Sequence, residues 1–309
     1  MTWKVFVDGS AGTTGLRIVE RLAARPEIEL LPIGEAERKA VPARLERIAA
    51  ADVSILCLPD SGAREIVEAV DQAGVEARLI DCSTAHRTAR GWLYGLPEAY
   101  RGVFRDDPTR YEVWREATRV ANPGCHATGF ILAARPFADW DLGYWPSGHL
   151  VAFSLTGYSG GGKAMIAEYE SPDRSPLLGA PRPYSLGEDH KHLAEIRRHG
   201  GYDPGWPIHF TPVVADFHSG LLVSVSLPDG FFEDTTLDKV SGRLREFYAG
   251  CPLVRVLDLA TGTEGGYLSA GGLAGRDDVE VLAAGRFTGT GAPVVDIVAR
   301  LDNLGKGAS

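Results

Sequence analysis

The tetrapeptide at 122–125, Asn-Pro-Gly-Cys, places a cysteine directly before a run of residues with helical periodicity. A thiol at a helix N-terminus has a lowered pKa, because the partial positive charge there stabilises the nucleophilic thiolate. Cys57 and Cys82 lie in or at the end of apolar strand-like runs, and Cys251 has no such electrostatic support. Cys125 is therefore the candidate catalytic nucleophile, with a small buried hydrophobic residue as the alternative.

The segment 190–195, His-Lys-His-Leu-Ala-Glu, brings two imidazoles and a carboxylate together ahead of a helix-like run. A histidine within reach of a thiol can carry the proton that a leaving group or a hemithioacetal oxygen needs, which makes His190 the candidate acid–base residue. The His-x-His spacing could also supply two metal ligands, but no further His/Cys cluster completes the usual three or four. A solvated histidine that caps a helix is the other alternative. We predict no metal site.

A glycine-rich segment at 9–15, Gly-Ser-Ala-Gly-Thr-Thr-Gly, joins the first strand-like run to the first helical run. Glycines in this position let main-chain amides approach a pyrophosphate, and the following helix N-terminus favours negative charge. A tight strand-to-helix turn without a ligand is the alternative. We expect this segment to bind a dinucleotide through Gly9, Ser10, Ala11, Gly12, Thr13, Thr14 and Gly15.

The residues after the second predicted strand bear on the choice of cofactor. An acidic residue there favours a ribose 2′-hydroxyl, whereas basic residues accommodate a 2′-phosphate. The chain carries Glu35 and then Arg38 and Lys39, and the basic pair favours NADP. A solvated basic pair on a loop is the alternative.

Two further segments have the composition of anion sites. Residues 157–163, Gly-Tyr-Ser-Gly-Gly-Gly-Lys, resemble a phosphate-binding loop but lack the spacing of a P-loop, so a flexible turn beside the cofactor is the simpler interpretation. Arg87 follows a predicted parallel strand, where ligands bind, and a guanidinium can hold an anion with two hydrogen bonds. A surface ion pair is the alternative for Arg87.

The elements that position these residues alternate in the first 120 or so residues, which indicates a doubly wound parallel sheet. The expected strands are 4–8, 28–33, 53–58 and 78–81, and the expected helices are 14–25, 43–50 and 62–73. After residue 122 the pattern changes to a mixed or antiparallel sheet, with strands at 150–156, 220–227, 253–257, 279–284 and 294–301 and helices at 128–137 and 237–248. Residues 171–183 form an irregular excursion that could be a lid or an oligomer contact.

Composition excludes several classes of protein. The 309 residues, with 44% hydrophobic and 24% charged, have the composition of an ordinary globular chain. A net charge of −9, from 32 Lys and Arg against 41 Asp and Glu, has the wrong sign for wrapping nucleic acid or lying on an anionic membrane. Four cysteines without CxxC spacing, and no apolar run long enough to span a membrane, lead us to expect a cytoplasmic protein with reduced thiols.

The chain as a whole resembles the shorter form of the N-acetyl-γ-glutamyl-phosphate reductase family. The resemblance rests on the motifs already described and on Ser-Thr-Ala-His-Arg at 83–87, Tyr-Gly-Leu-Pro-Glu at 94–98 and Asp-Asn-Leu-Gly-Lys-Gly-Ala-Ser at 302–309, which occur in the family's order. It implies the fold of aspartate-semialdehyde dehydrogenase: a Rossmann-type α/β domain at 1–121 and an α+β catalytic, substrate and oligomerisation domain at 122–309, whose end can return to the first domain.

The resemblance also implies NADPH-dependent reduction of N-acetyl-L-glutamyl 5-phosphate through a cysteine thioester, in arginine biosynthesis, by a homodimer or homotetramer. Cys125 and His190 take the catalytic roles. Substrate contacts fall on Arg87, Asn122, Lys163, His192 and Glu195, with His192 and Glu195 orienting His190 or the substrate. Further cofactor contacts fall on Leu58, Pro59, Ser83, Ser159, Gly160, Gly161 and Asn303. In two places the chain departs from the family: His126-Ala127 stand where Tyr-Pro is common, and the helical segment expected beyond Ser309 is absent from the sequence.

Two other functions remain open from the residues alone. One is a related reductase of aspartyl phosphate or of a carrier-linked aminoadipyl phosphate, because the shape of the substrate pocket decides between such substrates. The other is a non-catalytic dinucleotide-sensing module that uses the fold without the chemistry. A sensor needs neither Cys125 nor His190, so their presence together favours an enzyme.

Overall fold

The computed structural model describes residues 2–100, 112–138, 149–202, 205–227, 236–286 and 294–307. The described chain divides into two compact units. The first unit contains 2–95 and 112–123, and the second contains 96–100 and 124–307. Within the described residues, the chain leaves the first unit after residue 95 and again after residue 123. The predicted boundary after residue 121, with a chain end that can return to the first domain, stays a prediction.

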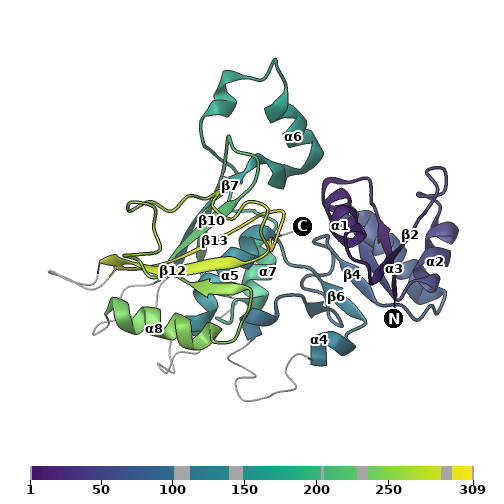
Figure 1. The fold of residues 1–309 in the computed structure, drawn as a ribbon, viewed down its shortest axis with the longest axis horizontal. Coiled ribbons are helices and arrows are strands. Elements are labelled where there is room, and N and C mark those ends of the chain that lie inside the picture. The colour runs from purple at the N-terminus through teal and green to yellow at the C-terminus, as the bar shows by residue number, and fades with distance from the viewer. Residues whose placement is uncertain are drawn as a thin grey trace. The chain divides into compact units, whose positions relative to one another are not determined.

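The first unit is built on a parallel sheet of six strands in the order β2-β1-β3-β4-β6-β5. The strands are β1 (Trp3–Asp8), β2 (Ile28–Leu31), β3 (Val53–Leu56), β4 (Leu79–Asp81), β5 (Leu93–Tyr94) and β6 (Arg119–Ala121). The helices are α1 (Thr13–Ala23), α2 (Val41–Ala50), α3 (Asp60–Gln72) and the short α4 (Glu112–Glu116). This confirms the predicted doubly wound parallel sheet (Figure 1).

The core of the first unit follows from the apolar faces of these elements. Phe6 of β1 and Leu56 of β3 are fully buried, and Ile48 of α2 and Ile66 of α3 pack against them. Burial of such side chains contributes about 1.5–3 kcal/mol each. The strand order reverses between β1 and β3, and the crevice at such a point is where a nucleotide binds in this class of sheet.

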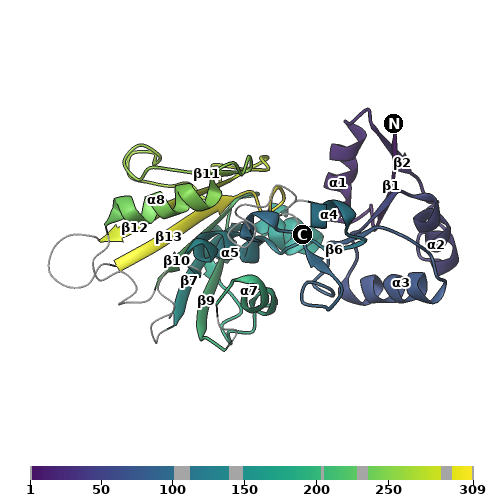
Figure 2. The ribbon, with the colours of Figure 1, turned by 90° about the horizontal axis from the view of Figure 1, so that it is seen from below.

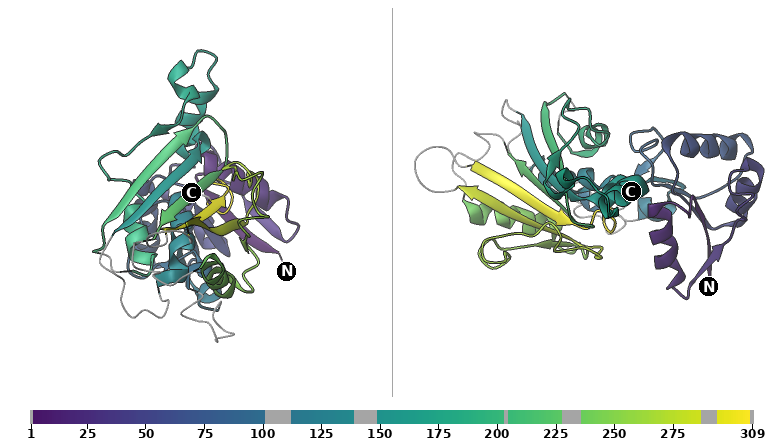
Figure 3. Two further views of the ribbon diagram at one scale, coloured as in Figure 1. Left: turned by 90° about the vertical axis from the view of Figure 1, so that its left-hand side faces the viewer. Right: turned by 90° about the horizontal axis from the view of Figure 1, so that it is seen from above.

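The second unit contains a mixed sheet of seven strands in the order β11-β12-β13-β10-β7-β9-β8. The strands are β7 (Leu150–Gly157), β8 (Arg182–Pro183), β9 (Ile208–Ala215), β10 (Leu221–Ser226), β11 (Val254–Val256), β12 (Val279–Arg286) and β13 (Val294–Leu301). The pairs β7–β9 and β11–β12 are parallel and the others are antiparallel, which confirms the predicted mixed sheet. Figure 3 shows its long strands from two further directions.

Helices cover one face of this sheet. The helices of the second unit are α5 (Cys125–Ala138), α6 (Gly162–Glu170), α7 (Leu193–His199) and α8 (Leu237–Tyr248). Helix α5 packs on β10 and β13, and α8 lies along β11 and β12 (Figure 2). Gly129 allows the close approach of α5, because a Cβ there would lie 2.6 Å from Val223 Cγ2 of β10. The packing places the first residue of α5 deep inside the unit.

The excursion at 171–183 is anchored to the rest of the second unit. Leu178 is 1% exposed and packs with Tyr169 of α6 and Val214 of β9, while β8 pairs with β9. Leu177 next to it is 76% exposed. The excursion therefore joins α6 to β9, and it leads directly into Tyr184, whose main-chain N–H donates to the Pro212 carbonyl at 3.0 Å.

Candidate active site

The glycine-rich segment forms the turn between β1 and α1, as the sequence predicts. Gly9 has φ +80°, and a Cβ there would lie 2.2 Å from the Cys57 carbonyl oxygen. A Cβ on Gly15 would lie 2.4 Å from the Gly9 oxygen, whereas one on Gly12 would stand at an ordinary 3.4 Å. The turn thus needs glycine at its first and last positions, and it places the N-terminus of α1 at the crevice between β1 and β3. A cradle of this kind fits a pyrophosphate.

The other predicted cofactor residues of the first unit lie at the same edge of the sheet. Leu58 and Pro59 follow β3, which lies next to β1, and Ser83 follows β4, which lies next to β3, so all three stand beyond the carboxyl ends of neighbouring parallel strands. Arg38 lies beyond β2, where its guanidinium is 3.3 Å from the Glu35 carboxylate, and both side chains are exposed, as is the neighbouring Lys39. The basic pair is thus partly balanced by the acidic residue before it.

The turn that carries Arg87 is fixed by a buried carboxylate. Asp81 accepts hydrogen bonds from the Ser83 N–H at 2.9 Å and from the Ser83 hydroxyl at 2.8 Å, and it lies 2.6 Å from His86 Nδ1. Arg87 itself is 4% exposed, with Nε donating to the Asn122 carbonyl at 2.9 Å and Nη2 to the Cys82 carbonyl at 3.1 Å. The surface ion pair considered for Arg87 is therefore wrong, and the guanidinium is held in one orientation.

Cys125 is the first residue of α5 and is 4% exposed. The main-chain N–H groups at this helix N-terminus favour a thiolate. The preceding residue is held by Glu195, which accepts a hydrogen bond from the Gly124 N–H at 3.0 Å in a buried environment. The pKa of Cys57, by contrast, is raised by a hydrogen bond with the Cys82 thiol and by burial, so Cys57 does not supply a thiolate.

His190 and His192 lie just before α7, and their rings meet edge to face with centroids 4.7 Å apart. The His192 N–H donates to His190 Nδ1 at 3.2 Å, which leaves the proton of a neutral His190 on Nε2. Burial and the nearby Lys191 lower the pKa of His190 to about 4, so the ring is neutral at pH 7. His190 is therefore arranged to donate a hydrogen bond from Nε2.

The structure adds His126 and Tyr184, which the sequence analysis did not assign to the site. The His126 ring lies 5.1 Å from that of His190 and 5.5 Å from that of His192, and Tyr184 lies 5.6 Å from His190. The proximity of Cys125 helps to raise the pKa of Tyr184, after burial. The one signal in the sequence was the position of His126 directly after the candidate nucleophile.

The predicted cofactor residues of the second unit also lie together. The Asn303 side-chain amide donates to the Ser159 hydroxyl at 3.0 Å and accepts from the Gly220 N–H at 2.7 Å. Gly160 lies against the same amide, with a hypothetical Cβ 3.2 Å from Asn303 Nδ2. Gly161 follows Gly160, and Lys163 is exposed in the first turn of α6. The glycine-rich segment thus forms a short turn tied to the last described residues of the chain.

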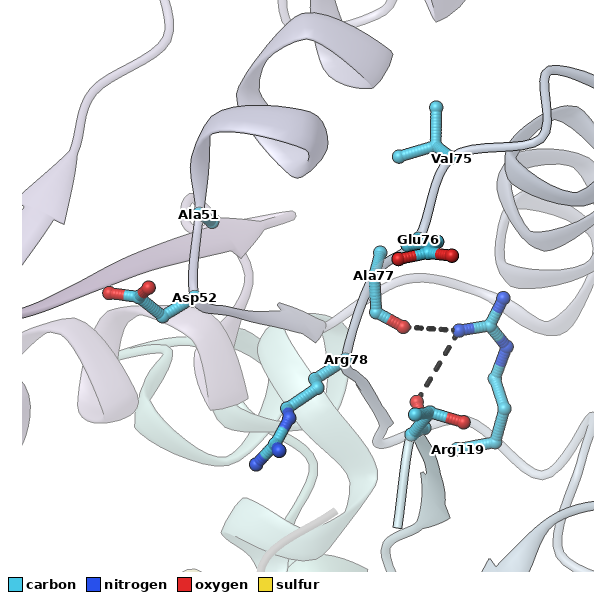
Figure 4. Close-up of a pocket in the computed structure, with 8 residues that line it drawn as sticks. Ala51, Asp52, Val75, Glu76, Ala77, Arg78 and Arg119 are labelled. Atoms are coloured by element: carbon cyan, nitrogen blue, oxygen red, sulfur yellow. Dashed lines mark hydrogen bonds between the residues drawn. The ribbon is translucent and has the colours of Figure 1, made fainter. Parts of the chain in front are cut away.

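A metal-binding cluster or a surface groove elsewhere in the described residues would be a further candidate site. No group of three or more His, Cys, Asp or Glu side chains in the described ranges is arranged to hold a metal ion. A surface groove in the first unit lies where β3, β4 and β6 begin, and there Arg119 donates to the Ala77 carbonyl at 2.6 Å (Figure 4). That groove is at the opposite edge of the sheet from the glycine turn.

Comparison with known proteins agrees with this geometry. Residues 4–106 match the family model for the semialdehyde dehydrogenase NAD binding domain, and residues 125–303 match that for the semialdehyde dehydrogenase dimerisation domain. N-acetyl-γ-glutamyl-phosphate reductase from Rhizobium etli (strain CIAT 652) is 41% identical over 312 residues, covering 100% of this chain and 96% of the relative. The protein of the same name from Rhizobium meliloti (strain 1021) is 40% identical, covering 99% and 95%.

Solved structures show the same fold. Aspartate semialdehyde dehydrogenase II from Vibrio cholerae superposes with a TM-score of 0.66 at 17% identity, covering 100% of this chain and 95% of that one. The aspartate semialdehyde dehydrogenase from Francisella tularensis gives 0.67 at 13% identity, covering 98% and 95%. None of the helices in the described residues has the length and hydropathy needed to cross a membrane.

Proposed function

Because the chain belongs to the N-acetyl-γ-glutamyl-phosphate reductase family, we propose that it reduces N-acetyl-L-glutamyl 5-phosphate to N-acetyl-L-glutamate 5-semialdehyde, with NADPH as reductant and inorganic phosphate as the second product, in arginine biosynthesis. The observation that carries the proposal is the placement of Cys125 at the first position of α5, in one unit with a neutral His190 whose Nε2 carries the proton. A nucleophile and a hydrogen-bond donor are the two groups that acyl transfer to sulfur requires.

In the proposed mechanism the Cys125 thiolate attacks the acyl phosphate carbonyl, a C–S bond forms, and phosphate leaves with the electrons of the C–O bond. NADPH, when bound, supplies the hydride that reduces the resulting thioester to a hemithioacetal. The neutral His190 donates its Nε2 hydrogen bond to the carbonyl oxygen as that oxygen becomes negative, and the same bond stabilises the oxyanion that remains after reduction. Collapse of the oxyanion re-forms the C=O bond, breaks the C–S bond, and releases the aldehyde and the Cys125 thiolate.

The proposed substrate contacts are the five residues assigned to the substrate from the family resemblance. Arg87 binds the phosphate, a role for which a buried guanidinium fixed by main-chain carbonyls is already oriented. Asn122, Lys163 and His192 contact the remainder of the substrate. Glu195 acts with them chiefly by holding the main chain at Gly124.

The cofactor is NADP(H), bound by the glycine turn and by the residues after β3 and β4, with Ser159 to Gly161 and Asn303 on the nicotinamide side. Support for the phosphate form comes from Arg38 and Lys39 after β2. Arg38→Ala should raise the KM for NADPH about 10-fold or more and leave the KM for NADH within about 2-fold, because the guanidinium is a partner only for the 2′-phosphate. Equal effects on both cofactors would contradict the preference.

One assay separates the proposed reaction from its rivals. The purified protein should reduce NADP when N-acetylglutamate semialdehyde and phosphate are both present, and not when phosphate is left out. Aspartate semialdehyde and a carrier-linked aminoadipate semialdehyde, offered in parallel, test the related reductases. A protein that binds NADP but reduces it with none of the three would be a sensing module.

The proposed assembly is a homodimer or homotetramer in the cytoplasm. Its support is the name of the family model matched by 125–303, together with the outward side of β7, where Val151 and Phe153 are 44% and 45% exposed. Exposed apolar side chains in the middle of a sheet are a common feature of subunit interfaces. Light scattering coupled to gel filtration would give the mass, and Phe153→Glu should shift it toward that of the monomer.

A further inference from the structure

His126 is the second residue of α5 and is 3% exposed, so its two ring nitrogens meet protein partners. Nδ1 lies 2.7 Å from the Ser154 hydroxyl of β7, and Nε2 lies 2.8 Å from the Tyr184 hydroxyl. These contacts connect the helix that begins with the nucleophile to the segment that follows β8. A histidine directly after a nucleophile thus has two specific polar partners.

The Ser154 hydroxyl determines which group donates and which accepts in the hydrogen bonds that join Ser154, His126 and Tyr184. The Ser154 hydroxyl donates its hydrogen to the Leu222 carbonyl at 3.3 Å, so towards His126 it is an acceptor. Burial lowers the pKa of His126 well below its ordinary value, and the charge of Lys191 and that of His190 when protonated act in the same direction, so the ring carries one proton. That proton is on Nδ1, and Nε2 accepts the hydrogen of the Tyr184 phenol.

Tyr184 in turn borders the His190 ring. Its main chain is fixed by the hydrogen bond to Pro212 of β9, and its ring centroid lies 5.6 Å from that of His190. Phe210 packs on His190 edge to face at 5.3 Å. The orientation of the His190 imidazole therefore depends on packing against Tyr184, and the direction of the Tyr184 hydroxyl depends on His126.

We propose that His126 is a positioning residue for the reduction proposed above: by accepting the phenolic hydrogen of Tyr184, it fixes that ring against His190 and keeps the His190 Nε2–H directed at the reacting oxygen. His126 itself is 3% exposed, and both of its ring nitrogens have protein partners. The inference rests on the proposed function, since its effect is measured in that reaction. It gives a role to a residue that the sequence showed only as a departure from the family's usual Tyr-Pro.

The test compares variants that differ in the acceptor they offer to Tyr184. His126→Phe removes the acceptor, whereas His126→Gln keeps an amide oxygen within reach of the position of Nε2. We expect His126→Phe and Tyr184→Phe each to lower kcat by about 10- to 100-fold with KM for the acyl phosphate within about 2-fold, as for an interaction realised in the transition state. His126→Gln should recover kcat to within about 3-fold of the wild type.

Two controls keep the outcome decisive. The double variant should be no slower than the slower single variant, because both changes remove one hydrogen bond. Nitrogen-15 NMR of the wild type should show the His126 proton on Nδ1. The inference is overturned by an unchanged kcat in His126→Phe, by equal losses in His126→Phe and His126→Gln, by additive losses in the double variant, or by a proton on Nε2.

Tyr184→Phe keeps the test valid if the buried His126→Phe change prevents folding, because Tyr184 is only half-buried and the change removes a single oxygen. The failure of the proposed function would look different from the failure of this inference. A wild-type protein that does not reduce the acyl phosphate refutes the function. An active wild type whose Tyr184→Phe variant is equally fast refutes the role of His126 alone.

Discussion

The Glu195 carboxylate of α7 accepts a hydrogen bond from the main-chain N–H of Gly124, at 3.0 Å and out of contact with solvent. The same carboxylate lies 3.9 Å from His192 Nε2. One side chain thus holds the residue before the nucleophile and borders the histidine pair, so the relative position of Cys125 and His190 within the second unit depends on it.

Replacing Glu195 should slow the reaction without removing either catalytic group. Glu195→Ala should lower kcat by about 100-fold, because a displacement of the nucleophile of about 1 Å is sufficient for such a loss. Glu195→Gln keeps an oxygen acceptor for the Gly124 N–H and should lose only about 10-fold, the difference between a charged and a neutral hydrogen bond. The matched control is Glu188→Gln, an exposed carboxylate paired with His209, which should leave kcat unchanged. Equal losses in both Glu195 variants would contradict the hydrogen bond's role.

An alanine substitution should be destabilising at a glycine of the turn and tolerated at a glycine of the neighbouring helix α3. Gly15→Ala places a Cβ 2.4 Å from the Gly9 oxygen and should destabilise the protein by about 1–3 kcal/mol and weaken NADPH binding. Gly62→Ala, inside α3, places its Cβ at an ordinary 3.7 Å from Leu58 Cβ and should be neutral or stabilise by about 0.5–1 kcal/mol. Urea denaturation measures both changes, and a fluorescence titration with NADPH measures binding. A stable, tightly binding Gly15→Ala variant would show that the turn tolerates a side chain.

The buried His190 should make stability depend on pH. Its pKa is about 4 in the folded protein against 6.5 for an ordinary histidine, so between these values the unfolded chain binds more protons. The contribution of the neutral ring is fully present above pH 6.5 and is lost as the pH falls towards about 4. His190→Asn should therefore reduce the fall in the free energy of unfolding between pH 7 and pH 5.

Urea denaturation at pH 7 and at pH 5 measures the free energy of unfolding of the wild type and of His190→Asn. If His190→Asn and the wild type lose the same free energy over this range, the histidine is not buried in its neutral form.

Elements with strong local patterns could be predicted from the sequence. Helix α8 and strand β13 begin and end at the predicted residues, since α8 carries a regular apolar face and a Thr236 cap that accepts from the Lys239 N–H. Strand β9 was missed because Pro212 interrupts its pattern, and β5, β6 and β8 are too short to show periodicity. Helix α5 begins three residues before the predicted start, because the Asn-Pro-Gly turn ends directly at Cys125.

Some residues of the candidate site could also be predicted from local sequence, and others could not. Cys125 and His190 could be proposed from local context, because a helix N-terminus and a His-x-His segment are visible in the sequence. The bond between Glu195 and Gly124 joins residues 71 apart, and that between His126 and Tyr184 joins residues 58 apart. Tertiary packing creates such contacts, and no local sequence pattern predicts them. Tyr184 was missed for this reason.

The covalent role of Cys125 is tested most directly by rapid mixing of the protein with N-acetylglutamate semialdehyde and NADP in the absence of phosphate. The wild type should form NADPH in a burst of about one equivalent per site and then stop, because the thioester accumulates without phosphate to release it. Adding phosphate should restart turnover, and Cys125→Ser should show neither the burst nor the turnover. A burst in Cys125→Ser, or steady turnover of the wild type without phosphate, would contradict a thioester on Cys125.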